Sequence, residues 1–344
     1  MRIVLGLSLT AATGAIALLA GCAGNSPGSS SLVPNASAPF GTALGPRARV
    51  SPLGTCTTER RLRARMTHNQ FAKPAKGLPY LYVVDACGPV VDVLNGKTYY
   101  ELGSITNGLN APRDAFVDRK GNLYVANFNG ANVTEYAAGN WSAPSFTYDV
   151  NMVNPQEVTA DANGNVYEAD SANGFINEYY QGSNIAITSC QPGYFTYGVA
   201  VDGRNDVFAE TTDDNNGQPE LVEYPGGLNN CPSPTVLPLP SADVGGGFPV
   251  AVDKNANLLI PNGDDVEVVD ASTSYGTVNA SLGGFECASN VTLNKANTLA
   301  FVTDSCADTV TVVNYPTLTI ANVLGSGNGL SEPYAAVAAP NAVY

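Results

Sequence analysis

Residues 112–136 read PRDAFVDRKGNLYVANFNGANVTEY. The pattern predicts an inner strand at AFVD, a tight turn at RKGN, a second strand at LYVAN, then a loop and a third strand at NVTEY. Asp118 opens the turn, where its side chain is expected to cap the backbone, and Gly121 suits a residue with positive φ. The stretch therefore predicts three antiparallel strands joined by short connections.

The same pattern returns four more times along the chain. The predicted inner strands end at Asp118, Asp161, Asp202, Asp253 and Asn294, which are 43, 41, 51 and 41 residues apart. Each is followed by candidates for a second, a third and an outer strand, which makes five four-stranded units. Aromatic residues recur at one position of the second strand and are expected to pack between neighbouring units: Tyr124, Tyr167 and Phe208. Repetition at this period is typical of β-propellers and related arrays.

The two ends of the chain supply the strands of a sixth unit. Residues 80–86 match a second strand, 89–94 a third strand and 99–105 an outer strand, while the missing inner strand fits EPYAAVAAP at 332–340. We therefore expect an all-β, six-bladed β-propeller over residues 77–344, closed by the C-terminal strand pairing into the N-terminal blade. The alternative, a seven-bladed ring, would need a further repeat, and we find none.

The stretch at 112–136 resembles the NHL-type repeat, P-x-G-[IV]-A-V-D-x-x-G-N-[IL]-Y-V-[AT]-D-x-x-N-x-x-[IV]. It departs from that pattern at Asp114, where Gly is usual, and at Asn127, where Asp is usual. The resemblance covers about residues 80–344 and implies the propeller fold. Rings of this type host lactonases, lyases, sensors and protein-binding modules, so the resemblance implies no single function.

The first 21 residues have the pattern of an export signal. Met1 and Arg2 precede an apolar run that ends in Leu19-Ala20-Gly21-Cys22, which resembles the bacterial lipobox. We expect cleavage before Cys22, acylation of its thiol and anchoring to a lipid membrane in the bacterial cell envelope, and Ala23 favours the outer membrane. The alternative is an ordinary secretory signal with a cysteine present by chance.

Residues 22–76 are expected to form a disordered tether, which is first rich in Pro and Ser and then basic. Residues 47–76 contain eight basic residues and one acidic residue, whereas from residue 77 onward there are seven basic and 29 acidic residues, a net charge of −22. Because phosphate contacts need cationic partners, this acidic body argues against nucleic acid as a partner.

In such rings, the loops that lead into the inner strands share one face with the loops after the second strands. The residues of the entry loops are the candidate ligand-binding set: Arg113, Asp114, Gln156, Glu157, Tyr197, Asn290 and Glu332. Glu157, Asn290 and Glu332 offer oxygen ligands of the kind that Ca²⁺ prefers, so Ca²⁺ is the candidate cofactor. The Asp or Asn that ends each second strand is expected to cap its own loop.

Two functions remain open. The first is a binding or scaffold module, expected to be a monomer, that recognises a protein, a peptide or a glycan on the loop face. The second is a metal-dependent hydrolase of the regucalcin or gluconolactonase-like kind. Lyases of this shape depend on histidines, and the chain has one histidine, His68, which precedes the propeller. We therefore do not expect lyase chemistry, and no catalytic residue can be assigned from the sequence.

With Cys22 acylated, an even number of cysteines remains, which in an exported protein favours disulfides. Cys287 and Cys306 should reach the same face and are the first expected pair. The remaining residues give two further candidate pairs, Cys56 with Cys87 and Cys190 with Cys231.

Overall fold

The computed structural model describes residues 79–86, 88–213, 218–240 and 250–339. These residues form 22 β-strands and three short 3₁₀ turns, with no α-helix among them. Within the same ranges, no helix is long and apolar enough to cross a membrane.

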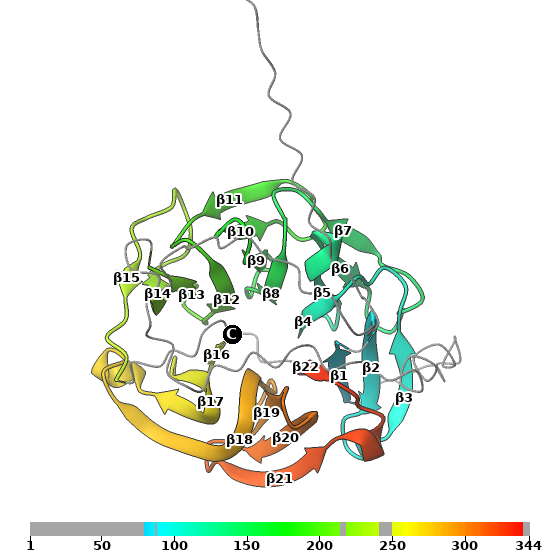
Figure 1. Ribbon diagram of the computed structural model, residues 1–344. Coiled ribbons are helices and arrows are strands. Elements are labelled where there is room, and N and C mark those ends of the chain that lie inside the picture. The colour runs from blue at the N-terminus through cyan, green and yellow to red at the C-terminus, as the bar shows by residue number, and fades with distance from the viewer. Residues whose placement is uncertain (1–78, 87, 214–217, 241–249, 340–344) are drawn as a thin grey trace, which may run out of the picture. The chain divides into compact units, whose positions relative to one another are not determined.

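The strands form five antiparallel sheets (Figure 1). The first sheet has the order β22 (Pro333–Ala339), β1 (Tyr80–Asp85), β2 (Val90–Asn95), β3 (Glu101–Ile105). The second sheet has the order β4 (Pro112–Val117), β5 (Leu123–Asn127), β6 (Asn132–Tyr136), β7 (Phe146–Tyr148). The third sheet has the order β8 (Pro155–Ala160), β9 (Val166–Asp170), β10 (Ile176–Tyr179), β11 (Ala186–Cys190). The fourth sheet has the order β12 (Thr196–Val201), β13 (Val207–Thr212), β14 (Pro219–Tyr224), β15 (Thr235–Val236).

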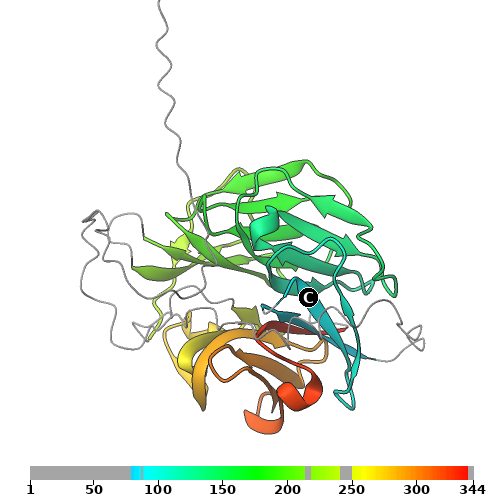
Figure 2. The same ribbon diagram turned by 45° about the vertical axis from the view of Figure 1, so that its right-hand side comes forward.

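The fifth sheet has six strands, in the order β16 (Ala251–Val252), β17 (Leu258–Val269), β18 (Val278–Leu293), β19 (Leu299–Asp304), β20 (Thr309–Asn314), β21 (Thr319–Leu324). The sheets are arranged around a common centre with β4, β8, β12, β16 and β22 innermost, which is the arrangement of a β-propeller (Figure 1). The turned view shows the sheets side by side around that centre (Figure 2).

The number of sheets differs from the expected six. The sequence pattern predicts an outer strand at 277–282 and a separate inner strand at 291–294, but both belong to the single long strand β18. Its first half pairs with β17 and its second half with β19, because residues 283–287 stay extended instead of forming a loop. The two units predicted around the turns at Asp253 and Asn294 are therefore one hydrogen-bonded sheet.

The two ends of the described chain meet in the first sheet. β22 pairs antiparallel with β1, from Tyr80 opposite Ala339 to Asp85 opposite Pro333. β2 and β3 follow outward from β1. One sheet thus contains both the earliest and the latest strand that the structure describes.

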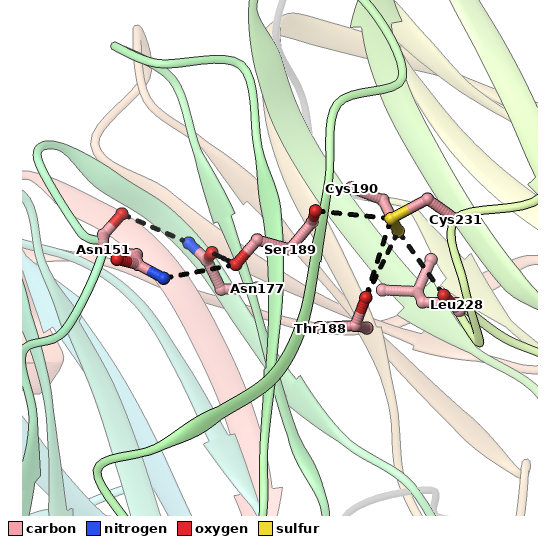
Figure 3. Close-up of a disulfide and its surroundings, with 7 residues drawn as sticks. All are labelled: Asn151, Asn177, Thr188, Ser189, Cys190, Leu228 and Cys231. Carbon is pink, nitrogen blue, oxygen red and sulfur yellow. Dashed lines mark hydrogen bonds between the residues drawn. A yellow bond between two sulfur atoms is a disulfide. The ribbon is translucent and has the colours of Figure 1, made fainter.

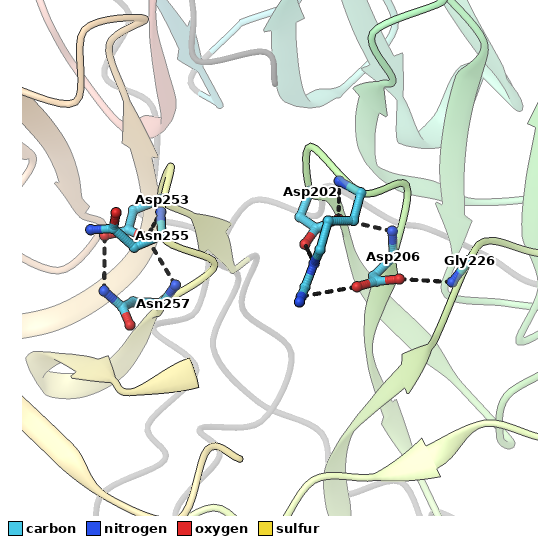
Figure 4. A network of polar contacts seen from close by, with 7 residues as sticks. Asp202, Asp206, Gly226, Asp253, Asn255 and Asn257 are labelled. Carbon is cyan, nitrogen blue, oxygen red and sulfur yellow. Dashed lines mark hydrogen bonds and ion pairs between the residues drawn. The ribbon is translucent and has the colours of Figure 1, made fainter. Parts of the chain in front are cut away.

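The acidic residue after each inner strand caps a tight turn, as the sequence pattern predicts. Asp161 Oδ1 accepts from the backbone N–H groups of Asn163 and Asn165, both at 2.8 Å, and the same i+2 and i+4 pattern recurs at Asp118, Asp202 and Asp253. Figure 4 shows two of these turns, at Asp202 and Asp253. A side chain that satisfies two backbone donors holds the hairpin in register.

Side chains from neighbouring sheets pack into separate apolar cores. Tyr124 lies in a core shared by the second and third sheets, Tyr167 in one shared by the third and fourth, and Phe208 in one shared by the fourth and fifth. All three are fully buried. The predicted packing of these recurring aromatic residues between units is confirmed.

Two disulfides lie within the described residues, and both match expected pairs. Cys190 at the end of β11 is bonded to Cys231 after β14, which connects the third and fourth sheets (Figure 3). Cys287 in β18 is bonded to Cys306 after β19. The third expected pair, Cys56 with Cys87, lies outside the described residues, as do Cys22 and the predicted tether.

Candidate functional site

The inner strands β4, β8, β12 and β22 and the second half of β18 share an irregularity at the same place, close to where each begins. The register with its neighbour skips one residue, so that a single residue stands out of the ladder as a β-bulge. The skipped residues, called the bulge ring below, are Arg113, Gln156, Tyr197, Ser289 and Tyr334. Because bulges re-aim side chains and are common beside binding sites, this end of the ring is the candidate functional face.

Arg113 is held between two aromatic rings. Its guanidinium carbon lies 5.0 Å from the centre of the Phe128 ring and 4.5 Å from that of Tyr334, both within the range of cation–π attraction. Its Nε is buried and has no hydrogen-bond partner. The contact links the second sheet, through β4, to the first sheet, through β22.

A second group of aromatic residues stands at the start of β12. The ring of Tyr197 lies 6.1 Å from that of Phe195, which in turn meets Tyr194 edge-on at 4.5 Å. Tyr194 is 62% exposed. Its backbone N–H donates to the carbonyl of Thr212, so an exposed aromatic side chain is displayed from an anchored segment.

Gly193 restricts the conformation of the backbone before β12. A Cβ at this position would lie 2.3 Å from the carbonyl oxygen of Thr212 and 2.4 Å from Thr211 Oγ1. Only glycine allows so close an approach of two backbones. Cys190, three residues earlier, is fixed by its disulfide (Figure 3). The aromatic group is therefore preorganised rather than free to move with a loop.

Directly after the bulge ring, three polar side chains form what is called the collar below: Asp114, Glu157 and Asn290. Asp114 accepts from the backbone N–H of Val158 at 3.1 Å and from Asn290 Nδ2 at 3.2 Å. Glu157 accepts from the backbone N–H of Val199. Each collar carboxyl thus holds the inner strand of the next sheet.

Burial dominates the electrostatics of the collar. It raises the pKa of Asp114 to about 7, although the hydrogen bonds from Val158 and Asn290 act in the opposite direction. Burial also raises the pKa of Glu157 well above its ordinary value, and the nearby charges of Asp114 and Glu210 add to this rise. The collar therefore favours neutral carboxyl groups unless a cation approaches them.

A narrow cavity runs along the inner strands below the collar. Asp114 and Glu157 line it together with residues of the inner strands, most of which have apolar side chains, such as Phe116, Val199 and Val291. Its volume is about 60 Å³. Sites for whole small molecules usually occupy about 300–1,000 Å³, so this cavity is far too small for one.

The structure brings six of the seven predicted entry-loop residues to one end of the ring. Arg113, Gln156 and Tyr197 belong to the bulge ring, whereas Asp114, Glu157 and Asn290 belong to the collar. None of these positions follows from composition alone, but the repeat alignment places them correctly.

Glu332 is the one candidate residue that lies in neither the bulge ring nor the collar. It precedes β22, and its carbonyl accepts from the N–H of Ala86. In the first sheet, Ala335 occupies the position that Asp114 has in the second sheet. Tyr334 is the residue that sequence reasoning missed. The signal was the pair Pro333-Tyr334, which matches Pro112-Arg113.

The expected calcium ligands can be compared with this geometry. In the described part of the chain, no three His, Cys, Asp or Glu side chains come together in a way that could hold a metal. Asn290 contacts Asp114, and the charges acting on Glu157 are those of Asp114 and Glu210. Ca²⁺ at Glu157, Asn290 and Glu332 therefore remains a prediction that the geometry does not favour.

The residues that end the second strands cap loops. Asp170 accepts from the backbone N–H groups of Val153 and Asn154, and Asp304 accepts from those of Glu286 and Cys287. Asn127 does the same for Asn110. Asp170 and Asp304 also accept from N–H groups of the loops that follow them, at Ala172 and Asn173 and at Cys306 and Ala307 respectively. The expected capping of their own loops is therefore confirmed for Asp170 and Asp304, whereas Asn127 caps the loop that enters β4.

Comparison with known proteins supports the fold. No family model matches the chain, and no curated protein sequence matches it. A chain in a crystal structure of a nidogen/laminin complex is similar to it, with a TM-score of 0.59 and 11% identity over 76% of this chain and 98% of that one. A functionally unknown protein from Desulfotomaculum acetoxidans has a TM-score of 0.53 and 11% identity over 77% and 99% of the two chains. At this identity the likeness shows a β-propeller fold alone.

Proposed function

We propose that this protein is an extracytoplasmic binding or scaffold module, anchored to a membrane through acylated Cys22, that recognises a protein, a peptide or a glycan with its bulge ring. The observation that carries the proposal is the contrast between the two parts of the site. The cavity of about 60 Å³ admits no whole substrate, whereas Tyr194 is exposed and the half-buried Arg113, Tyr197 and Tyr334 add cationic and aromatic groups from the bulge ring.

These groups suit recognition of a macromolecule. Tyr and Arg are enriched among the residues that dominate binding energy, because each offers a large contact area together with a polar group. Arg113 and Tyr334 meet in the bulge ring, and Tyr194 and Tyr197 extend the same surface. Their positions are set by bulges and by Gly193, so little ordering cost is left for binding.

The position of the chain entry fits a tether. Tyr80, the first strand residue, pairs with Ala339 at the end of β22 that is opposite to the bulge at Tyr334. A tether that precedes residue 79 therefore joins the ring at the face of the capped turns.

We propose further that the ring is of the NHL-like kind, with six blade units and closure by β22. The spacing of the turn-capping residues supports this count, because Asp253 and Asn294 cap separate turns within the six-stranded sheet. On this basis the sheet contains two units that share β18. The β1–β22 pairing supports the closure.

The binding function can be tested with libraries rather than with a known ligand. The full chain in detergent is exposed to a peptide display library and to a glycan array, and the retained ligands are retested on Arg113→Ala and on Lys120→Ala, a control at the face of the capped turns. We expect retained ligands that bind Lys120→Ala normally and Arg113→Ala poorly. Ligands that are sensitive to Lys120→Ala alone would place recognition on the other face and refute the proposal.

The hydrolase alternative is tested on the same preparation. A hydrolase of the lactonase kind should cleave lactones, lose that activity in EDTA and regain it with Ca²⁺. The binding proposal predicts no EDTA-sensitive cleavage and no large Ca²⁺-dependent increase in Tm. A Ca²⁺ effect that Glu157→Gln abolishes would favour the hydrolase.

Anchoring has a test of its own. Cys22→Ser should prevent acylation and shift the protein from the membrane fraction to the soluble fraction of cells. A variant that stays in the membrane fraction would contradict the lipid anchor, whatever the ring binds.

A further inference from the structure

The collar has more hydrogen-bond acceptors than donors. Asp114 and Glu157 each accept one backbone N–H from the next strand, and neither forms an ion pair with any described residue. Asn290 is 1% exposed, and its Oδ1 has no hydrogen-bond partner. A buried acceptor without a partner costs free energy, which a ligand that donates to it would recover.

The size of the space limits what this ligand is. About 60 Å³ holds a few water molecules or one terminal group of a longer molecule, and a sugar ring does not fit. The described acidic residues are also not grouped as a metal site requires. The collar therefore suits a small, hydrogen-bond-donating cation at the end of a chain.

Aromatic rings beside the collar already hold one cation. The guanidinium of Arg113 already stacks between Phe128 and Tyr334, so rings on this face favour a positive charge beside them. Tyr197 lies on β12, two inner strands along from Arg113 on β4. It precedes Gly198, which occupies the collar position of β12 and has no side chain to fill it. An aliphatic stem would pass such rings while its charged end reached the carboxyls.

We propose that the collar of Asp114, Glu157 and Asn290 receives the ammonium group of a lysine side chain presented by a protein or peptide partner. The inference rests on the proposed binding function and names the group that is recognised. Asp114 and Glu157 line the cavity, and Asn290 adjoins it through its hydrogen bond to Asp114. A lysine ammonium has three donors, enough for both carboxyl groups and the unpartnered Asn290 Oδ1. The net charge of −22 from residue 77 onward attracts such a partner at long range.

The experiment uses the isotope-labelled full chain in detergent and two small probes. Nα-acetyl-lysine amide carries the ammonium, and Nα-acetyl-norleucine amide has a similar stem without it. NMR follows the backbone N–H groups of Val158 and Val199, which donate to the collar carboxyls, and the side-chain amide of Asn290. We expect saturable shifts of these signals with the lysine probe and none with the norleucine probe.

A matched pair of variants locates the effect. The double variant Asp114→Asn/Glu157→Gln should weaken lysine binding by about tenfold or more, because two charge-assisted hydrogen bonds are lost, whereas Glu101→Gln, an exposed acid on β3, should leave it unchanged. Equal shifts with both probes, or no shifts with either, would overturn the inference, and so would Ca²⁺ acting where the lysine probe does not. The comparison of probes uses the unmodified chain, so it decides the question even if the double variant does not fold.

The outcome is separable from that of the proposed function. If peptides selected on the ring bind equally well after each lysine is replaced by norleucine, the collar inference fails while the binding function stands. If the lysine probe binds but no library ligand depends on Arg113, the collar inference stands and the proposed recognition face fails.

Discussion

Asn290 on β18 donates a hydrogen bond from Nδ2 to Asp114 Oδ1 on β4 at 3.2 Å, although the two residues lie 176 positions apart in the chain. The contact joins the fifth sheet to the second across the inner strands. Asp114 in turn holds Val158 of the third sheet. One buried carboxyl therefore ties together three of the five sheets.

Asn290→Ala should destabilise the fold and change the titration of Asp114. Loss of this donor removes an interaction that lowers the pKa of Asp114, so that pKa should rise above about 7. The free energy of unfolding should fall by about 1 kcal/mol or more. Urea denaturation and carbon-detected NMR titration of the Asp114 carboxyl measure the two effects. An unchanged pKa would mean that the contact does not persist in solution.

The capped turns predict a difference between two substitutions of one residue. Asp161→Ala removes the acceptor for the N–H groups of Asn163 and Asn165 and should cost about 1–3 kcal/mol. Asp161→Asn keeps an acceptor oxygen and should cost much less, because an amide oxygen can also cap such a turn: Asn294 Oδ1 accepts from the N–H groups of Thr298 and Leu299. Thermal denaturation of both variants measures this difference, and equal losses would contradict the capping role.

The two disulfides should contribute unequally. Cys190 and Cys231 are 41 residues apart and Cys287 and Cys306 are 19 apart, so loop-closure entropy predicts contributions of about 4 and about 3 kcal/mol. Replacing each pair by serine and measuring urea denaturation without reductant gives the two values. Peptide mapping that joined any of these cysteines to a different partner would contradict the structure.

Stability should fall as the pH rises from about 5 to 8, partly because of Glu168. This residue is 0% exposed and its Oε1 has no hydrogen-bond partner. Burial, with the charge of Asp170 nearby, raises its pKa well above the ordinary value. The folded state therefore keeps a proton that the unfolded state has lost above pH 5, which favours unfolding at higher pH.

Glu168→Gln is the matched test of this pH dependence. In the native protein Asn177 donates to Glu168 Oε2 at 2.9 Å. Glutamine at position 168 can still accept this hydrogen bond, but its side chain does not ionise. The decrease in Tm between pH 5 and pH 8 should be smaller in the variant by several degrees, at about 2–4 °C per kcal/mol. Identical pH profiles for the two proteins would show that Glu168 does not titrate as expected.

Local features of the fold could be predicted from the sequence. The turn caps depend on residues two to four positions apart, so the spacing of Asp118, Asp161 and their equivalents was sufficient. The disulfide between Cys287 and Cys306 followed from their expected places around one second strand. Six of the seven entry residues come to one end of the ring, as the repeat alignment predicts, because they occupy two adjacent positions of the repeat.

Features that depend on distant contacts or on backbone continuity could not be predicted. Residues 284–287 fall in an irregularity of the β17–β18 register, so the continuity of β18 depends on distant pairing on both sides of them, and the predicted number of sheets was wrong. The stacking of Arg113 on Tyr334 joins segments 221 positions apart, and the candidate set contained Glu332 but not Tyr334. The bulges themselves are seen only once the register is known.

Recognition by the bulge ring is tested most directly by one dissociation constant, measured for a ligand selected on the full chain and then on Tyr334→Ala and Tyr100→Ala. Tyr100, near the start of β3, is 72% exposed and lies outside the ring. We predict a Kd at least about tenfold higher for Tyr334→Ala and an unchanged Kd for Tyr100→Ala. An unchanged Kd for Tyr334→Ala, together with a loss of binding in Tyr100→Ala, would contradict recognition by the bulge ring.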